Sequence, residues 1–277
     1  MIKNVVYIFI SILFITSCSS AKNVSTILYK NVQKNDLSIS LKRNVPTYFF
    51  PKNLEVVLIG DSITEGIGDD TGNGGYGPFL KDKLSTRKDV KNVSITNLGV
   101  IGYRTDHLIK QLKNEEVKNV IADADMVLIT IGGNDMIKVV RDNLLNLSFN
   151  EFNQAQMQYE KRLSTIIELI RSQNNGGTVI LIGLYNPFIN LFESIDEIDK
   201  VIDNWNIASN RIIVKNENML FVNIDDIFHN NPEENLLGAD QFHPNKKGYE
   251  RIALRVYNQL LRKNPANIQY DIAKVQP

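Results

Sequence analysis

Five short apolar segments, each followed by a longer stretch with helical periodicity, constrain the fold of this chain more than any other feature. The segments cover residues 54–59, 93–98, 126–131, 178–182 and 219–224. Parallel strands that are buried on both faces have nearly continuous apolar sequences, and the helices that connect them cover those faces. The alternation therefore predicts the α/β class, as a doubly wound three-layer sandwich around a five-stranded parallel sheet.

A polar turn after the first segment indicates the order of the strands. Gly60-Asp61-Ser62 follows this strand directly, and open parallel sheets bind their ligands at the carboxyl ends of the strands. A five-stranded sheet with this turn suits the flavodoxin-like order 2-1-3-4-5, which also keeps every crossover right-handed. Helices are expected over residues 79–84, 105–117, 152–175, 194–215 and 244–262.

The length and charge of the chain disfavour one class of partner. Its 277 residues suit one large domain, in which Lys and Arg total 31 and Asp and Glu also total 31. A formal net charge of zero provides no global field that would attract nucleic acid, so we expect no nucleic-acid partner. The single cysteine, Cys18, cannot form an internal disulfide or a thiolate metal cluster.

The first residues have the layout of an export signal. Lys3 precedes an apolar stretch, residues 5–15, that is too short for a comfortable bilayer span of about 20 residues. The following Ile15-Thr16-Ser17-Cys18 resembles the lipobox of bacterial lipoproteins, which implies cleavage before Cys18 and attachment of lipid to it. The alternative is an uncleaved anchor with an incidental cysteine.

These features predict four regions and a location. The regions are a signal peptide (1–17), a lipidated N-terminus and tether (18–52), the main domain (53–265) and a C-terminal tail (266–277). The expected location is the bacterial cell envelope, where the lipid on Cys18 would anchor the exported protein to a membrane.

Ser62 is the candidate nucleophile, and it needs a base because a serine hydroxyl alone is a poor nucleophile. The chain contains His107, His229 and His243. Only His243 has a carboxylate, Asp240, three residues before it and a proline directly after it. A tight turn with this spacing lets Asp240 accept a hydrogen bond from one ring nitrogen, which leaves the other nitrogen for the serine proton. Each residue alone could equally be a turn former, but together they predict a Ser62, His243 and Asp240 triad.

Acyl transfer also requires hydrogen-bond donors for the oxyanion that develops on the carbonyl oxygen. Three candidates follow adjacent strands: the backbone N–H of Ser62, the backbone N–H of Gly99 and the side-chain amide of Asn134. Glycine permits close approach of the backbone to a substrate, and an asparagine amide donates without charge. Each could instead belong to an ordinary turn at a strand end.

Four blocks of the sequence together resemble the SGNH/GDSL hydrolase family. They are Gly60-Asp61-Ser62-Ile63, Asn97-Leu98-Gly99, Gly132-Gly133-Asn134-Asp135 and Asp240-Gln241-Phe242-His243-Pro244. The resemblance implies a flavodoxin-like SGNH fold, Ser62 as nucleophile, His243 as base, Asp240 as its partner, and an oxyanion hole of Ser62, Gly99 and Asn134. It implies neither a metal nor an organic cofactor. The leucine in the Gly-Asp-Ser-Leu motif of the family corresponds to Ile63 here, so one apolar residue replaces another.

The expected reaction is hydrolysis of a carboxylic ester through an acyl-enzyme on Ser62, but the substrate is less constrained. Residues 185–192 carry several large apolar side chains after the fourth strand, and we expect Phe188, Ile189 and Phe192 to line an acyl pocket. Such a pocket favours lipid or lysophospholipid esters; alternatively, these side chains cap the core. Two other functions remain open: O-deacetylation of envelope polysaccharide, and a lipid-anchored binding protein without catalysis.

Overall fold

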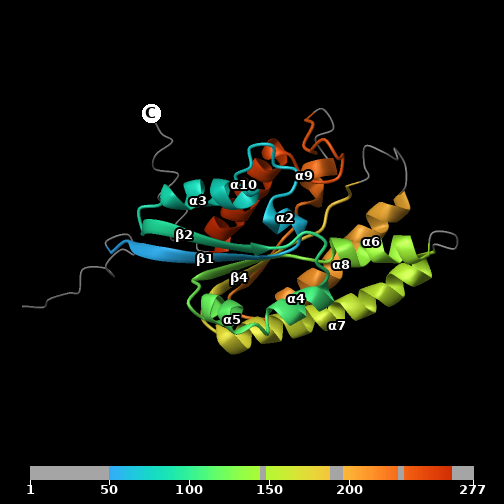
Figure 1. The fold of residues 1–277 in the computed structure, drawn as a ribbon, viewed down its shortest axis with the longest axis horizontal. Helices are drawn as coiled ribbons and strands as arrows, with labels where there is room; N and C mark the ends of the chain where they lie inside the picture. The colour runs from blue at the N-terminus through green and yellow to red at the C-terminus, as the bar shows by residue number, and fades with distance from the viewer. Residues whose placement is uncertain (1–49, 144–147, 188–195, 230–233, 264–277) are drawn as a thin grey trace, which may run out of the picture. The chain divides into compact units, whose positions relative to one another are not determined.

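A computed structural model of the protein describes residues 50–143, 148–187, 196–229 and 234–263 (Figure 1). Five parallel strands form one sheet in the order β2-β1-β3-β4-β5. The strands are β1 (Lys52–Gly60), β2 (Val90–Gly99), β3 (Met126–Thr130), β4 (Thr178–Ile182) and β5 (Met219–Val222). This confirms the predicted α/β class and strand order.

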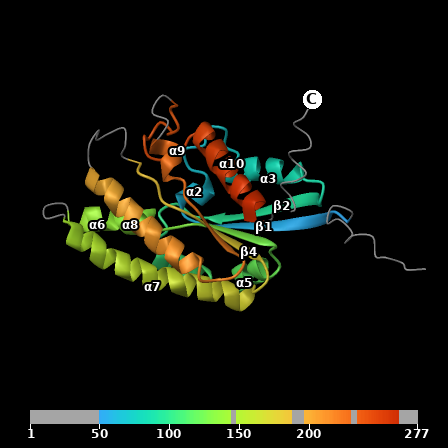
Figure 2. The ribbon, with the colours of Figure 1, turned by 180° about the vertical axis from the view of Figure 1, so that it is seen from behind.

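Helices cover both faces of the sheet, as the two opposite views show (Figures 1 and 2). One face carries α2 (Ser62–Glu65), α3 (Tyr76–Ser85), α9 (Asp225–His229) and α10 (Lys246–Lys263). The other face carries α4 (Thr105–Gln111), α5 (Glu115–Ala122), α6 (Gly133–Asp142), α7 (Phe149–Gln173) and α8 (Asp196–Ile213). None of the helices within these described residues is long and apolar enough to cross a membrane.

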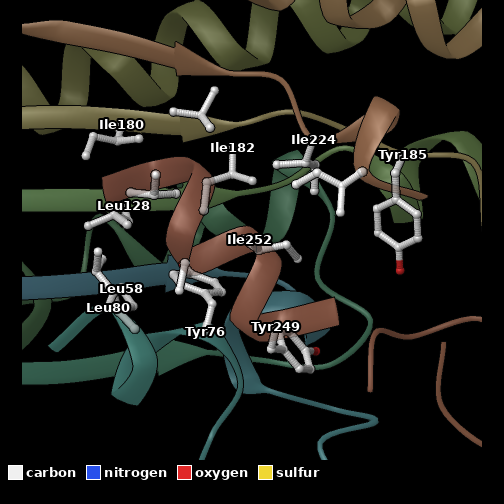
Figure 3. Packing of buried hydrophobic residues seen from close by; sticks show 14 of the residues in the cluster. Leu58, Tyr76, Leu80, Leu128, Ile180, Ile182, Tyr185, Ile224, Tyr249 and Ile252 are labelled. Carbon is white, nitrogen blue, oxygen red and sulfur yellow. The ribbon is translucent and has the colours of Figure 1, made fainter. Parts of the chain in front are cut away.

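Each layer of helices packs its own apolar cluster against the sheet. On the first face, Leu58 and Leu128 of the central strands contact a layer that includes Tyr76 of α3 and Tyr249 of α10, all fully buried (Figure 3). A second cluster on the other face is centred on α7, whose Leu163 is also fully buried. Burial of one such side chain stabilises the fold by about 1.5–3 kcal/mol. Since the central strands place side chains in the clusters on both faces, their sequences are apolar almost throughout.

The helix expected over residues 105–117 is in fact two helices. α4 ends at Gln111, and Asn114 begins α5 because its side-chain oxygen accepts hydrogen bonds from the backbone N–H groups of Glu116 (2.8 Å) and Val117 (3.4 Å). An asparagine in this position stabilises the start of a new helix. The single-helix prediction was therefore wrong, although the apolar Leu108 and Leu112 are both fully buried.

Several elements and boundaries also differ from the sequence predictions. The helices α2, α6 and α9 were not predicted; α2 and α9 are only four and five residues long, too short to show a helical period. β1 begins at Lys52, which the sequence placed in the tether. The predicted signal peptide, Cys18 and the C-terminal tail lie outside the described residues.

Gly60 occupies a position that no other residue suits. It ends β1, lies opposite both Gly99 of β2 and Thr130 of β3, and has a φ of +142°. A Cβ atom at this position would lie 1.9 Å from the carbonyl oxygen of Thr130. The close approach of β1 to β3 at the end of the sheet therefore requires glycine.

We expect Gly60→Ala to lower the free energy of unfolding by about 2–4 kcal/mol, because both the backbone conformation and the contact with Thr130 become strained. Urea unfolding followed by circular dichroism measures this difference. Gly176→Ala is the matched control, since Gly176 has no atom near the added Cβ and no positive φ. Equal stability of the two variants would contradict the role given to Gly60.

Candidate active site

Ser62 lies at the carboxyl end of β1, where the chain turns into α2. Asp61 precedes it in an extended conformation and caps the helix, because its Oδ1 accepts a hydrogen bond from the N–H of Ile63 at 3.1 Å. The N–H of Ser62 donates to no group of the described residues. The cap thus presents both the hydroxyl and the N–H of Ser62 at the edge of the sheet.

A chain of buried hydroxyl groups supports this turn from behind. The hydroxyl of Thr130 donates to Asp61 Oδ1 at 2.7 Å, and it also bonds the hydroxyl of Thr64 at 2.7 Å. Thr64 in turn bonds the Tyr76 hydroxyl at 3.0 Å. Burial raises the pKa of Asp61 above its usual value, although the hydrogen bonds from Thr130 and the Ile63 N–H act in the opposite direction.

The structure brings His243 and Asp240 to Ser62 from a turn 181 residues further along the chain. His243 Nε2 lies 2.9 Å from Ser62 Oγ, and His243 Nδ1 lies 2.6 Å from Asp240 Oδ2. These are the contacts that a serine, histidine and aspartate triad requires.

The Asp240 carboxylate also shapes the turn itself. Its Oδ1 accepts hydrogen bonds from the backbone N–H groups of Phe242 (3.0 Å) and His243 (2.9 Å). Partial burial acts to raise the pKa of Asp240, but these bonds and the bond from the His243 ring outweigh it and lower the pKa below its usual value. Asp240 is therefore ionised at neutral pH.

Two further contacts hold this turn against the domain. The Tyr185 hydroxyl donates to the carbonyl oxygen of Phe242 at 2.7 Å, and the Gly238 N–H donates to the carbonyl oxygen of His243 at 2.7 Å. Gly68 packs beneath the turn, where a Cβ atom would lie 2.8 Å from the His243 Cβ. Sequence reasoning did not identify Tyr185 in this role, because the contact joins residues 57 positions apart.

The three predicted oxyanion donors have different environments. Asn134, near the start of α6, uses one amide hydrogen to bond the carbonyl oxygen of Tyr103 at 3.0 Å and keeps a second hydrogen for another acceptor. The N–H of Gly99 donates to the Asn97 side chain at 2.9 Å. Gly99 as an oxyanion donor stays a prediction. It requires that the Gly99 N–H give up its hydrogen bond to the Asn97 side chain and donate to the substrate oxygen instead.

Gly102 is a further candidate that the sequence reasoning missed. It lies in the turn between β2 and α4 at a φ of +78°, directly before Tyr103, whose carbonyl oxygen contacts Asn134. Its N–H makes no hydrogen bond with any described residue. The glycine of Val100-Ile101-Gly102-Tyr103 was the available signal, since a glycine at positive φ marks a tight turn.

An apolar cavity of about 400 Å³ opens beside Ser62. Its walls come from strand ends, from one side of α6, from the first turn of α7 and from α8, and include Ile131, Met136, Ile137, Val140, Phe149, Phe152, Ile182, Leu184, Ile198, Val201 and Ile202. Ser62 and Asn134 both lie in its lining. A group bound at the triad can therefore extend into an apolar space.

The predicted pocket residues Phe188, Ile189 and Phe192 lie outside the described residues. Tyr185 and Pro187, which belong to the same segment, do line the cavity. The helices α6, α7 and α8 supply nearly half of its lining residues, and sequence reasoning assigned none of these helices to an acyl pocket. Amphipathic helices of this kind would equally fit a closed core, so the sequence contains no signal for the empty space.

The other two histidines have partners away from Ser62. His107 lies on α4, where its ring contacts the Arg104 side chain (3.1 Å) and Tyr103. His229 lies on α9 between Asp199 (3.3 Å) and Asp225 (3.7 Å). Within the described ranges, no three His, Cys, Asp or Glu residues are arranged to hold a metal ion.

The raised pKa of Asp61 gives a testable pH dependence. The folded state binds the Asp61 proton more tightly than the unfolded state does. Asp61 therefore reduces the stability of the fold as the pH rises above 3.8, the pKa of this carboxyl in the unfolded chain. Asp61→Asn removes this dependence and retains an oxygen acceptor for Thr130 and Ile63. The stability of the variant relative to the unmodified protein should therefore rise between pH 4 and pH 8 in urea titrations, and a constant difference would contradict it.

The GDSL-like Lipase/Acylhydrolase family matches residues 58–251, a range that contains both Ser62 and His243. The protein YpmR of Bacillus subtilis, described as uncharacterized, is 38% identical over 210 residues, which is 76% of this chain and 82% of the relative. The spore germination lipase LipC of Bacillus licheniformis is 24% identical over 206 residues, which is 72% of this chain and 93% of the relative.

Solved structures share the fold at lower sequence identity. The lipase Lip_vut3 from a goat rumen metagenome has a TM-score of 0.66 at 24% identity, over 73% of this chain and 95% of that one. A variant of the acetylxylan esterase Axe2 from Geobacillus stearothermophilus has a TM-score of 0.55 at 20% identity, over 77% of this chain and 94% of that one. The extent of the family match and the 38% identity to YpmR together show that the chain belongs to the GDSL-like lipase/acylhydrolase family.

Proposed function

We propose that this protein hydrolyses carboxylic esters of medium or long acyl chains, with Ser62 as the nucleophile. One observation carries the proposal: Ser62, which contacts His243 (2.9 Å) and through it Asp240 (2.6 Å), also lines an apolar cavity of about 400 Å³. The triad supplies the chemistry, and the cavity supplies a site for an acyl chain.

The reaction proceeds in two steps. Ser62 Oγ attacks the ester carbonyl carbon while His243 Nε2 takes the serine proton, and Asp240 stabilises the imidazolium that forms. The N–H of Ser62 and the Asn134 amide donate to the oxyanion, together with a backbone N–H from Gly99 or Gly102. His243 then returns the proton to the departing alcohol. Water, activated by His243, hydrolyses the acyl-enzyme and restores Ser62.

The composition of the cavity favours a lipid over an acetylated sugar. Beyond Asn134 near Ser62, the side chains that α6 adds to the lining are Met136, Ile137 and Val140, whereas the exposed side of the same helix carries Lys138 and Arg141. Burial of each CH₂ group of an acyl chain in such a space contributes about 0.8 kcal/mol. An acetyl group would leave most of this apolar space without a ligand.

The family relatives support an ester substrate without fixing the acyl chain. LipC is named as a lipase and Axe2 as an acetylxylan esterase, and both resemble this chain. The experiment must therefore distinguish hydrolysis of lipid esters from O-deacetylation of envelope polysaccharide. A binding protein without turnover is the third possible function. We favour the lipid ester because of the cavity.

Hydrolysis of p-nitrophenyl acetate, butyrate and octanoate by the protein tests the proposal. We expect kcat/KM to rise with chain length, since each added CH₂ is buried in the cavity, and Ser62→Ala to abolish turnover. Activity confined to acetate would support the deacetylase. Failure of all three esters, together with no labelling of Ser62 by a fluorophosphonate, would leave the binding protein.

A cavity-filling variant tests the location of the acyl chain in the same assay. Val140→Trp places an indole ring in the proposed acyl site, so octanoate turnover should fall while acetate turnover changes little. Val214→Trp is the matched control, because Val214 is 67% exposed and follows α8. Equal losses on both esters in Val140→Trp would place the acyl chain elsewhere.

We further propose that the protein is exported and anchored to a membrane of the bacterial envelope through lipid on Cys18. The support is the lipobox-like Ile15-Thr16-Ser17-Cys18 after a short apolar stretch. A membrane anchor would place the cavity near lipid esters.

Growth of a producing bacterium with an alkyne analogue of palmitate tests the anchor. The full chain should incorporate the label and be found with the membranes, while Cys18→Ser should remain unlabelled. Ser19→Ala is the control for the neighbouring position and should be labelled normally. A Cys18→Ser protein that still carries the label would exclude this cysteine as the lipid site.

A further inference from the structure

Next to the proposed oxyanion donors lies an ion pair between a buried carboxylate and a partly exposed guanidinium, which the triad does not use. Asp135, 5% exposed, follows Asn134 on α6. Its Oδ1 accepts hydrogen bonds from the Thr105 hydroxyl (2.5 Å) and from Arg162 Nη2 (3.0 Å), and its Oδ2 accepts from the Thr105 N–H (2.9 Å). Arg162 Nε closes the cluster by donating to the Thr105 hydroxyl at 2.6 Å. We call these three residues the clamp.

The clamp joins three elements that are distant in sequence. Thr105 begins α4, Asp135 lies in the first turn of α6, and Arg162 lies in the middle of α7. Such an ion pair adds little net stability, because the buried carboxylate loses its hydration and solvent screens the partly exposed guanidinium. A gain in stability therefore does not explain the clamp, and its geometry is the more informative property.

The clamp lies beside a further contact between α6 and the turn after β2. Asn134 directly precedes Asp135, and its amide bonds the carbonyl oxygen of Tyr103, two residues before Thr105. The turn with Gly99 and Gly102 is thereby held to α6 at two successive points. The same turn is also held on its other side, because the Glu65 carboxylate accepts a hydrogen bond from the N–H of Ile101.

The helix α7 holds the start of α6 at a second point, one turn before Arg162. Gly132, at a φ of +118°, packs so closely on Tyr159 that a Cβ atom would lie 2.8 Å from its ring. The Tyr159 hydroxyl in turn bonds the hydroxyl of Ser209 on α8 at 2.8 Å. Tyr159 and Arg162 thus contact the two ends of Gly132-Gly133-Asn134-Asp135.

We propose that Arg162 is a positioning residue for the oxyanion hole: through Asp135 and Thr105 it sets the separation between the Asn134 amide and the backbone N–H groups of the turn after β2. The inference rests on the ester hydrolysis proposed above. Donors to an oxyanion act only when they are fixed at hydrogen-bond distance from the atom that becomes charged, and a displacement of about 1 Å can cost about 100-fold in rate.

Three substitutions in the full chain test this role. Arg162→Lys retains the positive charge but cannot donate to Thr105 and Asp135 together from a planar group. Thr105→Val retains the shape of the side chain and loses the hydroxyl, whereas Thr105→Ser retains the hydroxyl. We expect kcat to fall about 10-fold to 100-fold in Arg162→Lys and Thr105→Val, with KM nearly unchanged, and to recover in Thr105→Ser.

Arg171→Lys is the matched control on the same helix. Arg171 donates to the carbonyl oxygens of Gly177 (2.7 Å) and Glu217 (2.9 Å) at the end of the sheet opposite Ser62, so its change should lower the melting temperature without a change in kcat. Thermal unfolding of every variant shows whether a lost rate reflects lost structure.

Two readouts separate positioning from a purely structural role. Binding of phenylboronic acid, which forms a tetrahedral adduct with Ser62 Oγ, should weaken in parallel with kcat, and the pH dependence of kcat/KM should stay unchanged because the triad is intact. An Arg162→Lys protein that loses melting temperature but keeps kcat and boronate affinity, as expected for Arg171→Lys, would overturn the proposal. Turnover by the unmodified protein and its loss in Ser62→Ala decide the ester hydrolysis separately.

Discussion

The parallel register of the three strands β2, β1 and β3 determines where everything else in the site can lie. Gly60 pairs with Gly99 on one side and with Thr130 on the other, so the three strands end at the same level. The chain continues from these strand ends into the segments of the site. Ser62 begins α2, Gly102 lies in the turn before α4, and Asn134 lies at the start of α6. The buried apolar clusters on both faces fix this register, since a shift of one residue would turn each strand's side chains to the opposite face.

Sequence reasoning identified the parts of the site whose signals are local. Ser62 follows an apolar strand directly, and Asp240 and His243 lie within one turn, so a few neighbouring residues were enough to single them out. The strand order was predicted from the polar turn after the first of five strands, which suits the flavodoxin-like order and keeps the crossovers right-handed. The break between α4 and α5 was missed because the capping by Asn114 outweighs a continuous apolar face.

The cavity and the clamp depend on contacts that no local pattern records. The cavity is the space left between α6, α7 and α8, and its size depends on how closely these helices approach. Arg162 lies on a helix with an otherwise apolar buried face and was not singled out from the sequence; only the fold brings it to Asp135. The bond from Tyr185 to Phe242 is hidden from sequence reasoning for the same reason.

Three carboxylates near the site illustrate how differently one functional group is used. Asp61 is buried against hydroxyl groups and its pKa is raised, Asp135 is paired with a guanidinium, and Asp240 is half exposed with a lowered pKa. The last of these uses one oxygen for two backbone N–H groups and the other for the imidazole. Backbone shape and ring orientation are consequently one property of this turn, so loss of the Asp240 carboxylate would disturb the path of the main chain together with the direction of the imidazole.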